Sequence, residues 1–253
     1  MLIRGKIAII PIKGIVTSEG GSSSLFLFPW RRGVSSAETV RFLEEVEKKR
    51  SIKAVLLEIN SSGGTPFSCR EIAEKIKSLS KPTAAWVKEY GTSGAYWIAS
   101  SCDVIVADKL SRIGSIGVLS IRADISELLK KFGIDIETMA SGIFKTLGVP
   151  YRKIAPQERE ILKEEMDAIY KFFLREVTEN RKLAKETVEK ISSGKVYLGP
   201  EAKSLGLIDH LGGRREALEV LRKRARIRSY GILDYNKKMK RPASLLRRLI
   251  ENL

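Results

Sequence analysis

Short apolar runs alternate with helix-forming segments along the first half of the chain. Ala54–Ile59, Thr83–Val87 and Asp103–Ala107 are almost continuously apolar, which is typical of strands buried on both faces of a sheet. The segments between these runs carry apolar residues at helical spacing, such as Ile72 and Ile76. Strands that alternate with helices in this way form a largely parallel sheet with the helices packed outside it. The sequence therefore predicts an α/β fold.

The chain has 253 residues, which is enough for one large domain or two small ones. No internal repeat or clear linker is visible, so we expect one domain over residues 1–230 and an appended tail over residues 231–253. Basic residues in the tail surround an apolar stripe that includes Leu245, Leu249 and Leu253, which is typical of an amphipathic helix. Such a helix can lie on an anionic membrane, dock on a neighbouring subunit or pack on its own domain.

Apolar runs and net charge limit the neighbours that the chain can have. No apolar run approaches the roughly 18 residues that a membrane-spanning helix needs, so we expect a soluble chain, cytoplasmic or peripherally membrane-associated. The chain carries 46 Lys and Arg against 30 Asp and Glu, a net charge of +16. That charge favours anionic neighbours, or simply a solubilising surface. No nucleic-acid-binding signature is present, so no specific nucleic-acid partner is expected.

Cysteine and histidine are too rare for several kinds of site. Cys69 and Cys102 are the only cysteines and form no disulfide framework or CxxC pair. The only histidine, His210, excludes a multi-histidine metal site, and we expect no metal and no cofactor. His210 also lies in an apolar segment that runs into a glycine turn, so we interpret it as structural. A lysine can serve as the base of a serine nucleophile if burial or nearby donors lower its pKa towards neutrality.

Two glycine-rich turns follow predicted strands and are candidates for chemistry. Ser93 stands between Gly91-Thr92 and Gly94, where a strand turns into a short helix, and such a turn exposes a serine hydroxyl beside helix N–H groups. The adjacent Gly63 and Gly64 leave backbone N–H groups uncovered, as an oxyanion hole requires. Both features are also compatible with ordinary turn chemistry.

Several motifs together resemble the signal peptide peptidase A (SppA) family of serine-lysine proteases. They occur in the order and spacing of that family, over roughly Gly5 to Ala225, and are Ile59–Gly64, Ser93–Ala99, Ile113–Val118, Ser141–Lys145, Val196–Ala202 and Gly206–Asp209. The resemblance implies a ClpP/crotonase-like fold, which is a spiral of ββα units with a largely parallel sheet and outer helices. Many members begin with a membrane helix, whereas this sequence starts directly before its first predicted strand.

The resemblance also implies a role for five residues. Ser93 matches the nucleophile and Lys145 matches the general base. Ser115 matches the hydroxyl that orients the lysine. The backbone N–H groups of Gly64 and Gly94 match the oxyanion hole.

The predicted base needs surroundings that exclude water. The segment Ile134–Met139 is predicted to be a strand, and Phe144 and Leu147 flank Lys145. We expect these side chains and the apolar sheet edge to desolvate the amine, which disfavours its charged form. A neutral amine can take the proton of Ser93 and return it to the leaving amine.

These expectations combine into one function. The chain is predicted to be a serine endopeptidase that forms an acyl-enzyme at Ser93 and hydrolyses unfolded or apolar peptides, such as released signal peptides. The resemblance implies a homo-oligomer, a ring or dome with inward-facing active sites, and the apolar loop Leu25–Trp30 is a candidate contact in it. Gly63–Phe67 and Gly114–Leu119 are expected to bind an extended peptide as an added strand.

Two alternative functions stay open at the level of sequence. A crotonase-type acyl-CoA enzyme shares the oxyanion-hole glycines but works through Glu or Asp, and no acidic residue stands beside Ser93 or Gly63-Gly64 in the sequence. A nonenzymatic basic scaffold would bind anionic membranes or nucleic acid through its charge. Its binding would weaken steeply with salt and would survive Ser93→Ala.

Overall fold

The computed structural model describes residues 3–20 and 33–236. The predicted contact loop Leu25–Trp30 and the tail beyond residue 236 therefore lie outside the described residues. The chain divides into two compact units, which are described separately below. The first unit contains residues up to 116 and from 174 onward, and the second contains residues 117–173.

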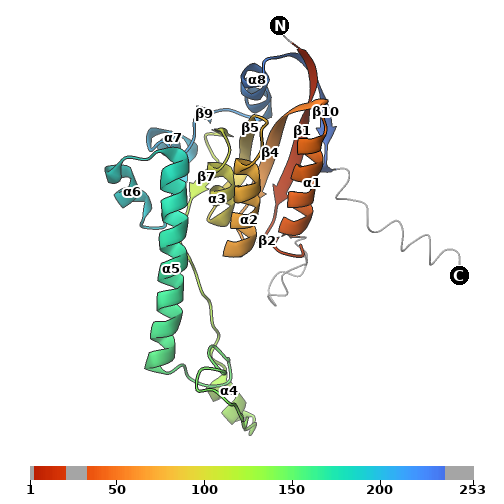
Figure 1. The fold of residues 1–253 in the computed structure, drawn as a ribbon. Helices are drawn as coiled ribbons and strands as arrows, with labels where there is room; N and C mark the ends of the chain where they lie inside the picture. The colour runs from red at the N-terminus through yellow and green to blue at the C-terminus, as the bar shows by residue number, and fades with distance from the viewer. Residues whose placement is uncertain (1–2, 21–32, 237–253) are drawn as a thin grey trace, which may run out of the picture. The chain divides into compact units, whose positions relative to one another are not determined.

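A mostly parallel sheet forms the centre of the first unit (Figure 1). The six strands along it are all paired in parallel, in the order β10 (Ile227–Asp234), β1 (Ile3–Lys13), β4 (Ile52–Ser61), β5 (Thr83–Thr92), β6 (Val104–Ala107) and β9 (His210–Leu211). Two shorter strands add to the sheet beside the last residues of β5. β7 (Arg112–Gly114) pairs in parallel with β5, and β8 (Val196–Leu198) pairs antiparallel with β7. The predicted largely parallel sheet is confirmed.

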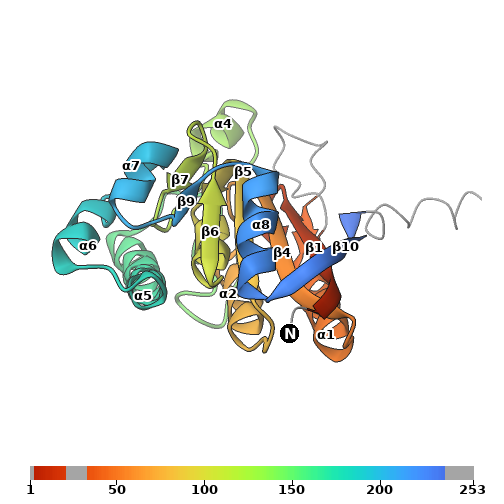
Figure 2. The same cartoon turned by 90° about the horizontal axis from the view of Figure 1, so that it is seen from above.

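Helices of the first unit cover both faces of this sheet. The first unit contains α1 (Ser36–Lys48), α2 (Pro66–Lys77), α3 (Gly94–Ser100), α6 (Lys185–Ile191), α7 (Gly199–Ser204), α8 (Arg214–Arg224) and the end of α5 (Pro156–Arg181), and of these α3 and α8 both pack on β4 and β5. Leu218 and Leu221 of α8 pack in one core cluster with Leu56 of β4, and α8 lies across β4 and β5 in Figure 2. The next residue along β4, Leu57, points to the other face and is also fully buried. This double burial explains why β4 is apolar without alternation.

Local signals place the helix ends where the sequence predicts them. The Ser35 hydroxyl accepts a hydrogen bond from the Glu38 N–H at 3.1 Å, which caps the start of α1. Just before α1, β3 (Val34–Ser35) pairs in parallel with β2 (Val16–Thr17) as a separate two-stranded sheet.

The sheet continues into the segment that was predicted to be a tail. β10 runs to Asp234, which pairs with Ile9 of β1. Tyr235 is fully buried, and its ring packs against Phe42 with 4.9 Å between ring centroids. Residues 231–234 therefore belong to the sheet of the first unit, and Tyr235 belongs to its core.

The second unit has less regular structure than the sequence suggests. It contains α4 (Ser126–Lys131) and the first part of α5, both of which were predicted, and otherwise loops. The prediction of a strand over Ile134–Met139 is wrong. Ile134 is 50% exposed and Met139 is 92% exposed, and residues 117–173 include no strand that could pair with this segment. An apolar segment without a pairing partner cannot satisfy its backbone as a strand. None of the described helices is long and apolar enough to cross a membrane.

An ion pair links the loops of the second unit to α5. Arg152 donates through both terminal nitrogens to the carboxylate of Glu158, with 2.7 Å from Nη1 to Oε2. The Ala155 N–H donates to the same carboxylate at 3.0 Å. The hydrogen bonds from Arg152 and then from Ala155 lower the pKa of Glu158 to about 2.

This shift predicts a pH-dependent stability difference between the wild type and Glu158→Gln. The pKa is lower in the folded chain than the ordinary value of 4.5, so the stabilisation is fully present above about pH 5 and is lost as the pH falls towards 2. In denaturant unfolding, Glu158→Gln should be less stable than the wild type at pH 6, and the difference should shrink at pH 3. Glu160→Gln, at an exposed position of the same helix, should be as stable as the wild type at both pH values. A difference of equal size at both pH values would contradict the assignment.

Candidate active site

Ser93 occupies a strained turn between β5 and α3. Its backbone has φ 53° and ψ −132°, a region that residues with a Cβ atom adopt only under strain. The Ser93 N–H donates to the Gly114 carbonyl at 2.7 Å, and the Ser93 carbonyl accepts from the Tyr96 N–H at 2.9 Å. A serine held in this way between a strand and a helix presents its hydroxyl at the sheet edge, which is the arrangement of a nucleophile elbow.

Hydrogen bonds from distant segments hold α3 and therefore Ser93. The Tyr96 hydroxyl donates to the Leu207 carbonyl at 2.8 Å, and Trp97 Nε1 donates to Glu176 at 2.8 Å. Asn180 donates to the Ser100 hydroxyl at 3.1 Å. Sequence reasoning missed Glu176 and Asn180, because nothing local indicates that α5 packs against a helix about 80 residues earlier. These bonds make the support of the turn rigid, as a preorganised site requires.

The backbone N–H of Gly64 faces the side of the turn that holds Ser93. The Val16 N–H donates to the Gly63 carbonyl and the Thr65 N–H donates to the Val16 carbonyl, both at 2.9 Å. In this parallel pattern the N–H and C=O of Gly64 point away from Val16. A Cβ atom placed on Gly94 would lie 3.4 Å from the Gly64 nitrogen, so the two glycines are close neighbours.

Gly94 supplies the second amide of the predicted oxyanion hole. It is the first residue of α3, so its N–H has no acceptor within that helix. The Gly64 and Gly94 amides are thus two neighbouring donors at the Ser93 turn. Two such donors can stabilise an oxygen that gains negative charge during acyl transfer.

Close packing explains why glycine stands at these positions. A Cβ atom on Gly64 would lie 1.9 Å from the Val16 carbonyl oxygen, and one on Gly94 would lie 2.3 Å from Cys69 Sγ. Gly63 has φ 104°, and a Cβ atom there would lie 2.8 Å from the Gly94 nitrogen. The backbone segments can approach each other this closely only without side chains.

The Val16 contact leads to a stability prediction for Gly64→Ala. The clash is with backbone and cannot be relieved by a rotamer change, so the loop has to move. We expect a loss of about 2–3 kcal/mol in unfolding free energy, at the upper end for overpacking. Chemical denaturation measures it, with Gly231→Ala as the control because a Cβ atom there meets its nearest neighbour at 3.9 Å. Equal stability of the two variants would show that the loop is loosely packed.

Ser115 lies next to Ser93 through strand pairing. Thr92 and Gly114 are partners in the β5–β7 ladder, and the two serines directly follow them. Ser115 also has a positive φ of 50°, and its N–H donates to the Lys195 carbonyl at 3.0 Å. The first unit therefore brings together Ser93, Ser115 and the amides of Gly64 and Gly94.

Lys145 belongs to the second unit, and its side chain is exposed. Phe144, which was expected to shield it, is itself 42% exposed. The expected dry surroundings are therefore wrong for the chain by itself. The reason is that the loop around Lys145 has no strand, and hence no sheet edge, to cover it. The pairing of Lys145 with Ser93 stays a prediction.

The two expected peptide-binding edges are only partly free. Gly64 already pairs with Val16 on one side, and α2 begins at Pro66. β7 is paired on both sides, with β5 and β8. Peptide binding along Gly63–Phe67 and Gly114–Leu119 stays a prediction; within these segments Gly64 pairs with Val16 and Gly114 pairs with β5 and β8. The outward side of Gly64 stays available to a peptide.

The remaining candidate nucleophiles and ligands fit a structural role. Burial raises the pKa of Cys69 to about 12, and burial also raises the pKa of Cys102, so neither thiol ionises readily. His210 lies in β9 opposite Val106, and its side chain is exposed. Within residues 3–20 and 33–236, no group of three or more His, Cys, Asp and Glu side chains is arranged to hold a metal ion.

Comparison with known proteins gives a family match and several relatives. The model of peptidase family S49 matches residues 75–228. A protein of Methanocaldococcus jannaschii named as a protease is 36% identical over 198 residues, which is 78% of this chain and 64% of that protein. A protein of Enterococcus faecium named as a signal peptide peptidase SppA is 30% identical over 233 residues, covering 91% of this chain and 67% of the relative. Protease 4 of Haemophilus influenzae is 28% identical over 221 residues, covering 85% of this chain and 34% of the relative. The chain thus spans about two thirds of the first two relatives and about a third of Protease 4.

Solved structures support the same fold. A ClpP1 mutant from Listeria monocytogenes matches with a TM-score of 0.54 and 15% identity, covering 83% of this chain and 94% of that one. A mutant of the 1510-N membrane-bound stomatin-specific protease also matches with a TM-score of 0.54 and 15% identity, covering 86% and 85% of the two chains. The predicted ClpP-like fold and the predicted family resemblance are both confirmed.

Proposed function

Since the chain belongs to peptidase family S49, we propose that it is a serine endopeptidase in which Ser93 is the nucleophile and Lys145 the general base. The observation that carries this proposal is the strained Ser93 turn beside the amides of Gly64 and Gly94. The family match also favours a peptidase over a crotonase-type enzyme or a basic scaffold.

The proposed reaction proceeds through an acyl-enzyme. Ser93 Oγ attacks the peptide carbonyl while the neutral amine of Lys145 takes its proton. The carbonyl oxygen gains negative charge and accepts hydrogen bonds from the Gly64 and Gly94 N–H groups. Lys145 then gives the proton to the leaving amine. A water molecule, deprotonated by Lys145, releases the acyl group and restores Ser93.

Ser115 has a supporting role in this proposal. Its hydroxyl can accept a hydrogen bond from the Lys145 amine and thereby direct the amine lone pair towards Ser93. It does so without adding a negative charge, which would favour the ammonium form of the lysine. This role is supported by the positions of Ser93 and Ser115, which directly follow the paired residues Thr92 and Gly114.

Apolar peptides are the substrates that the surroundings of Ser93 favour. Phe67, in the first turn of α2 and three residues after Gly64, is 68% exposed. An apolar side chain of a substrate bound at the outward side of Gly64 would find a contact there. We include released signal peptides among these substrates because one relative is named for that activity.

Assembly of several copies would supply the dry surroundings that Lys145 lacks. The second unit exposes large apolar side chains, namely Leu119, Ile121, Phe132, Met139 and Ile143. Exposed apolar groups in this number are typical of interaction surfaces. We therefore infer a homo-oligomer. The family resemblance implies a ring or dome with inward-facing sites, and the proposed location is the cytoplasm or a membrane periphery. A contact of the basic tail with anionic lipid belongs to the same proposal.

Labelling of the nucleophile tests the proposed function. A fluorophosphonate probe, which reacts with activated serine hydroxyls, should add once per chain, and peptide mapping should place the adduct on Ser93. The labelled protein should lose the ability to digest a denatured protein. An adduct on another serine, or digestion that continues after complete labelling, would overturn the proposal.

A further inference from the structure

The segment that carries Lys145 is a series of turns with few backbone bonds. The Lys145 N–H donates to the Gly142 carbonyl at 3.0 Å, and the Leu147 N–H donates to the Phe144 carbonyl at 3.1 Å. Residues 141–150 are mostly exposed and include no helix or strand. Such a segment needs contacts from outside itself if it is to hold a side chain in one place.

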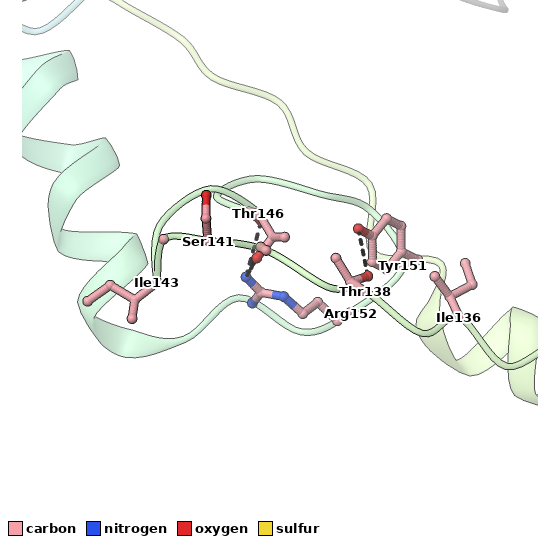
Figure 3. Close-up of a pocket in the computed structure, with 9 residues that line it drawn as sticks. Ile136, Thr138, Ser141, Ile143, Thr146, Tyr151 and Arg152 are labelled. Atoms are coloured by element: carbon pink, nitrogen blue, oxygen red, sulfur yellow. Dashed lines mark hydrogen bonds between the residues drawn. The ribbon is translucent and has the colours of Figure 1, made fainter.

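Open space borders this segment on one side. A cavity of about 470 Å³ is lined by Ser141, Gly142, Ile143 and Thr146, among others (Figure 3). Arg152 lines the same cavity. No packed core holds the Lys145 segment in place on this side. Polar contacts therefore have to hold it.

Arg152 makes polar contacts with the residue directly after Lys145. Its Nη2 donates to both oxygens of Thr146, at 2.8 Å to the hydroxyl and 3.1 Å to the carbonyl, as drawn in Figure 3. Thr146 directly follows Lys145 in the chain. One nitrogen of the guanidinium, Nη2, thus binds both the side-chain and the backbone oxygen of the residue that follows the predicted base.

Glu158 anchors this guanidinium group to a helix. It lies in the first turn of α5, is 3% exposed and pairs with both terminal nitrogens of Arg152. The Ala155 N–H also donates to Oε2 of this carboxylate at 3.0 Å. A buried carboxylate that accepts hydrogen bonds from both terminal nitrogens restricts the orientation of the arginine.

Arg122 restrains the far end of the same segment. Its guanidinium donates to the carbonyl groups of Val149 and Arg152. The Ile125 N–H donates to the Pro150 carbonyl at 2.9 Å. The loop is thus held at residues 146 and 149–152, and Arg152 is the side chain that joins it to α5.

We propose that Arg152 is a positioning residue that, braced by Glu158, holds the Thr146 peptide unit and so fixes Lys145 for proton transfer. This inference rests on the proposed function of Lys145. Displacement of a catalytic group by about 1 Å can cost about 100-fold in rate. The effect of losing Arg152 should fall on the chemical step and not on peptide binding.

Kinetics of Arg152→Ala test this role in the full chain, with an apolar fluorogenic peptide as substrate. We expect kcat to fall by at least about 10-fold while KM changes by less than about 3-fold. Guanidinium ions at low millimolar concentration should restore part of kcat. Arg159→Ala, at an exposed position of α5, should keep wild-type kinetics. Arg152→Lys should have a kcat close to that of Arg152→Ala, because an ammonium group cannot bind Glu158 and both Thr146 oxygens at the same time.

Hydrogen exchange and a milder variant complete the test. In Arg152→Ala, the amides of residues 142–149 should exchange faster than in the wild type. If Arg152→Ala does not fold, Thr146→Val decides, because it removes one acceptor and leaves the ion pair intact; kcat should then fall about 3-fold.

The outcomes separate this inference from the proposed function. Wild-type kcat in Arg152→Ala, or in Thr146→Val, beside an inactive Lys145→Ala would overturn the positioning role alone. Full activity in Lys145→Ala would overturn the proposed function and the positioning role with it. A kcat of Arg152→Lys equal to that of the wild type would show that a positive charge is enough at this position. It would overturn the role of the guanidinium group.

Discussion

Ser93→Ala should abolish peptide hydrolysis while the protein stays folded. The hydroxyl is the group that forms the acyl-enzyme, and neither buried cysteine can replace it at neutral pH. We expect kcat/KM to fall by at least about 100-fold. Alanine keeps the Cβ atom, so the strain at φ 53° and the backbone bonds of the turn are unchanged. Digestion of a denatured protein, followed by gel electrophoresis, measures the loss.

Two control variants separate the chemistry of Ser93 from its conformation. Ser93→Gly should be equally inactive, yet more stable than Ser93→Ala by about 1 kcal/mol, because glycine relieves the positive φ. Ser101→Ala changes a serine at the other end of α3, whose hydroxyl donates to the Ile98 carbonyl at 2.7 Å, and this variant should keep its activity. Hydrolysis by Ser93→Ala at the wild-type rate would refute the nucleophile.

Lys145→Ala should also lower kcat/KM by at least about 100-fold. Without the amine, no group is assigned to take the Ser93 proton or to protonate the leaving amine. Lys145→Arg should be just as inactive, because a guanidinium stays protonated and cannot act as a base. Since the side chain is exposed, both variants should unfold at the same denaturant concentration as the wild type.

The control for Lys145 is another exposed lysine of the second unit. Lys130 forms a surface ion pair with Glu127 at 3.5 Å, so Lys130→Ala removes the same charge without touching the predicted base. It should keep wild-type activity towards the fluorogenic peptide. Activity that persists in Lys145→Ala would remove the base assignment, and loss of activity in Lys130→Ala would point to a general effect of charge.

The sequence determined those features that depend on near neighbours. The run Ala54–Ile59 identified β4, because a strand covered on both faces has to be apolar throughout. The Ser35 cap and the periodicity of Pro156–Arg181 identified α1 and α5 for the same local reason. The turn at Ser93 was visible because a strand run, glycines and a helix start follow one another within a few residues.

The tertiary structure decided what depends on which distant segments meet. Gly64 must be glycine because Val16, 48 residues earlier, approaches it, and α3 is fixed by Glu176 from α5. Ile134–Met139 has the apolar pattern of a strand but no partner strand in the second unit, and Lys145 in the same unit is exposed. Strand pairing, close backbone approach and burial are properties of two surfaces in contact, so a local pattern can signal readiness for them but not the partner that completes them.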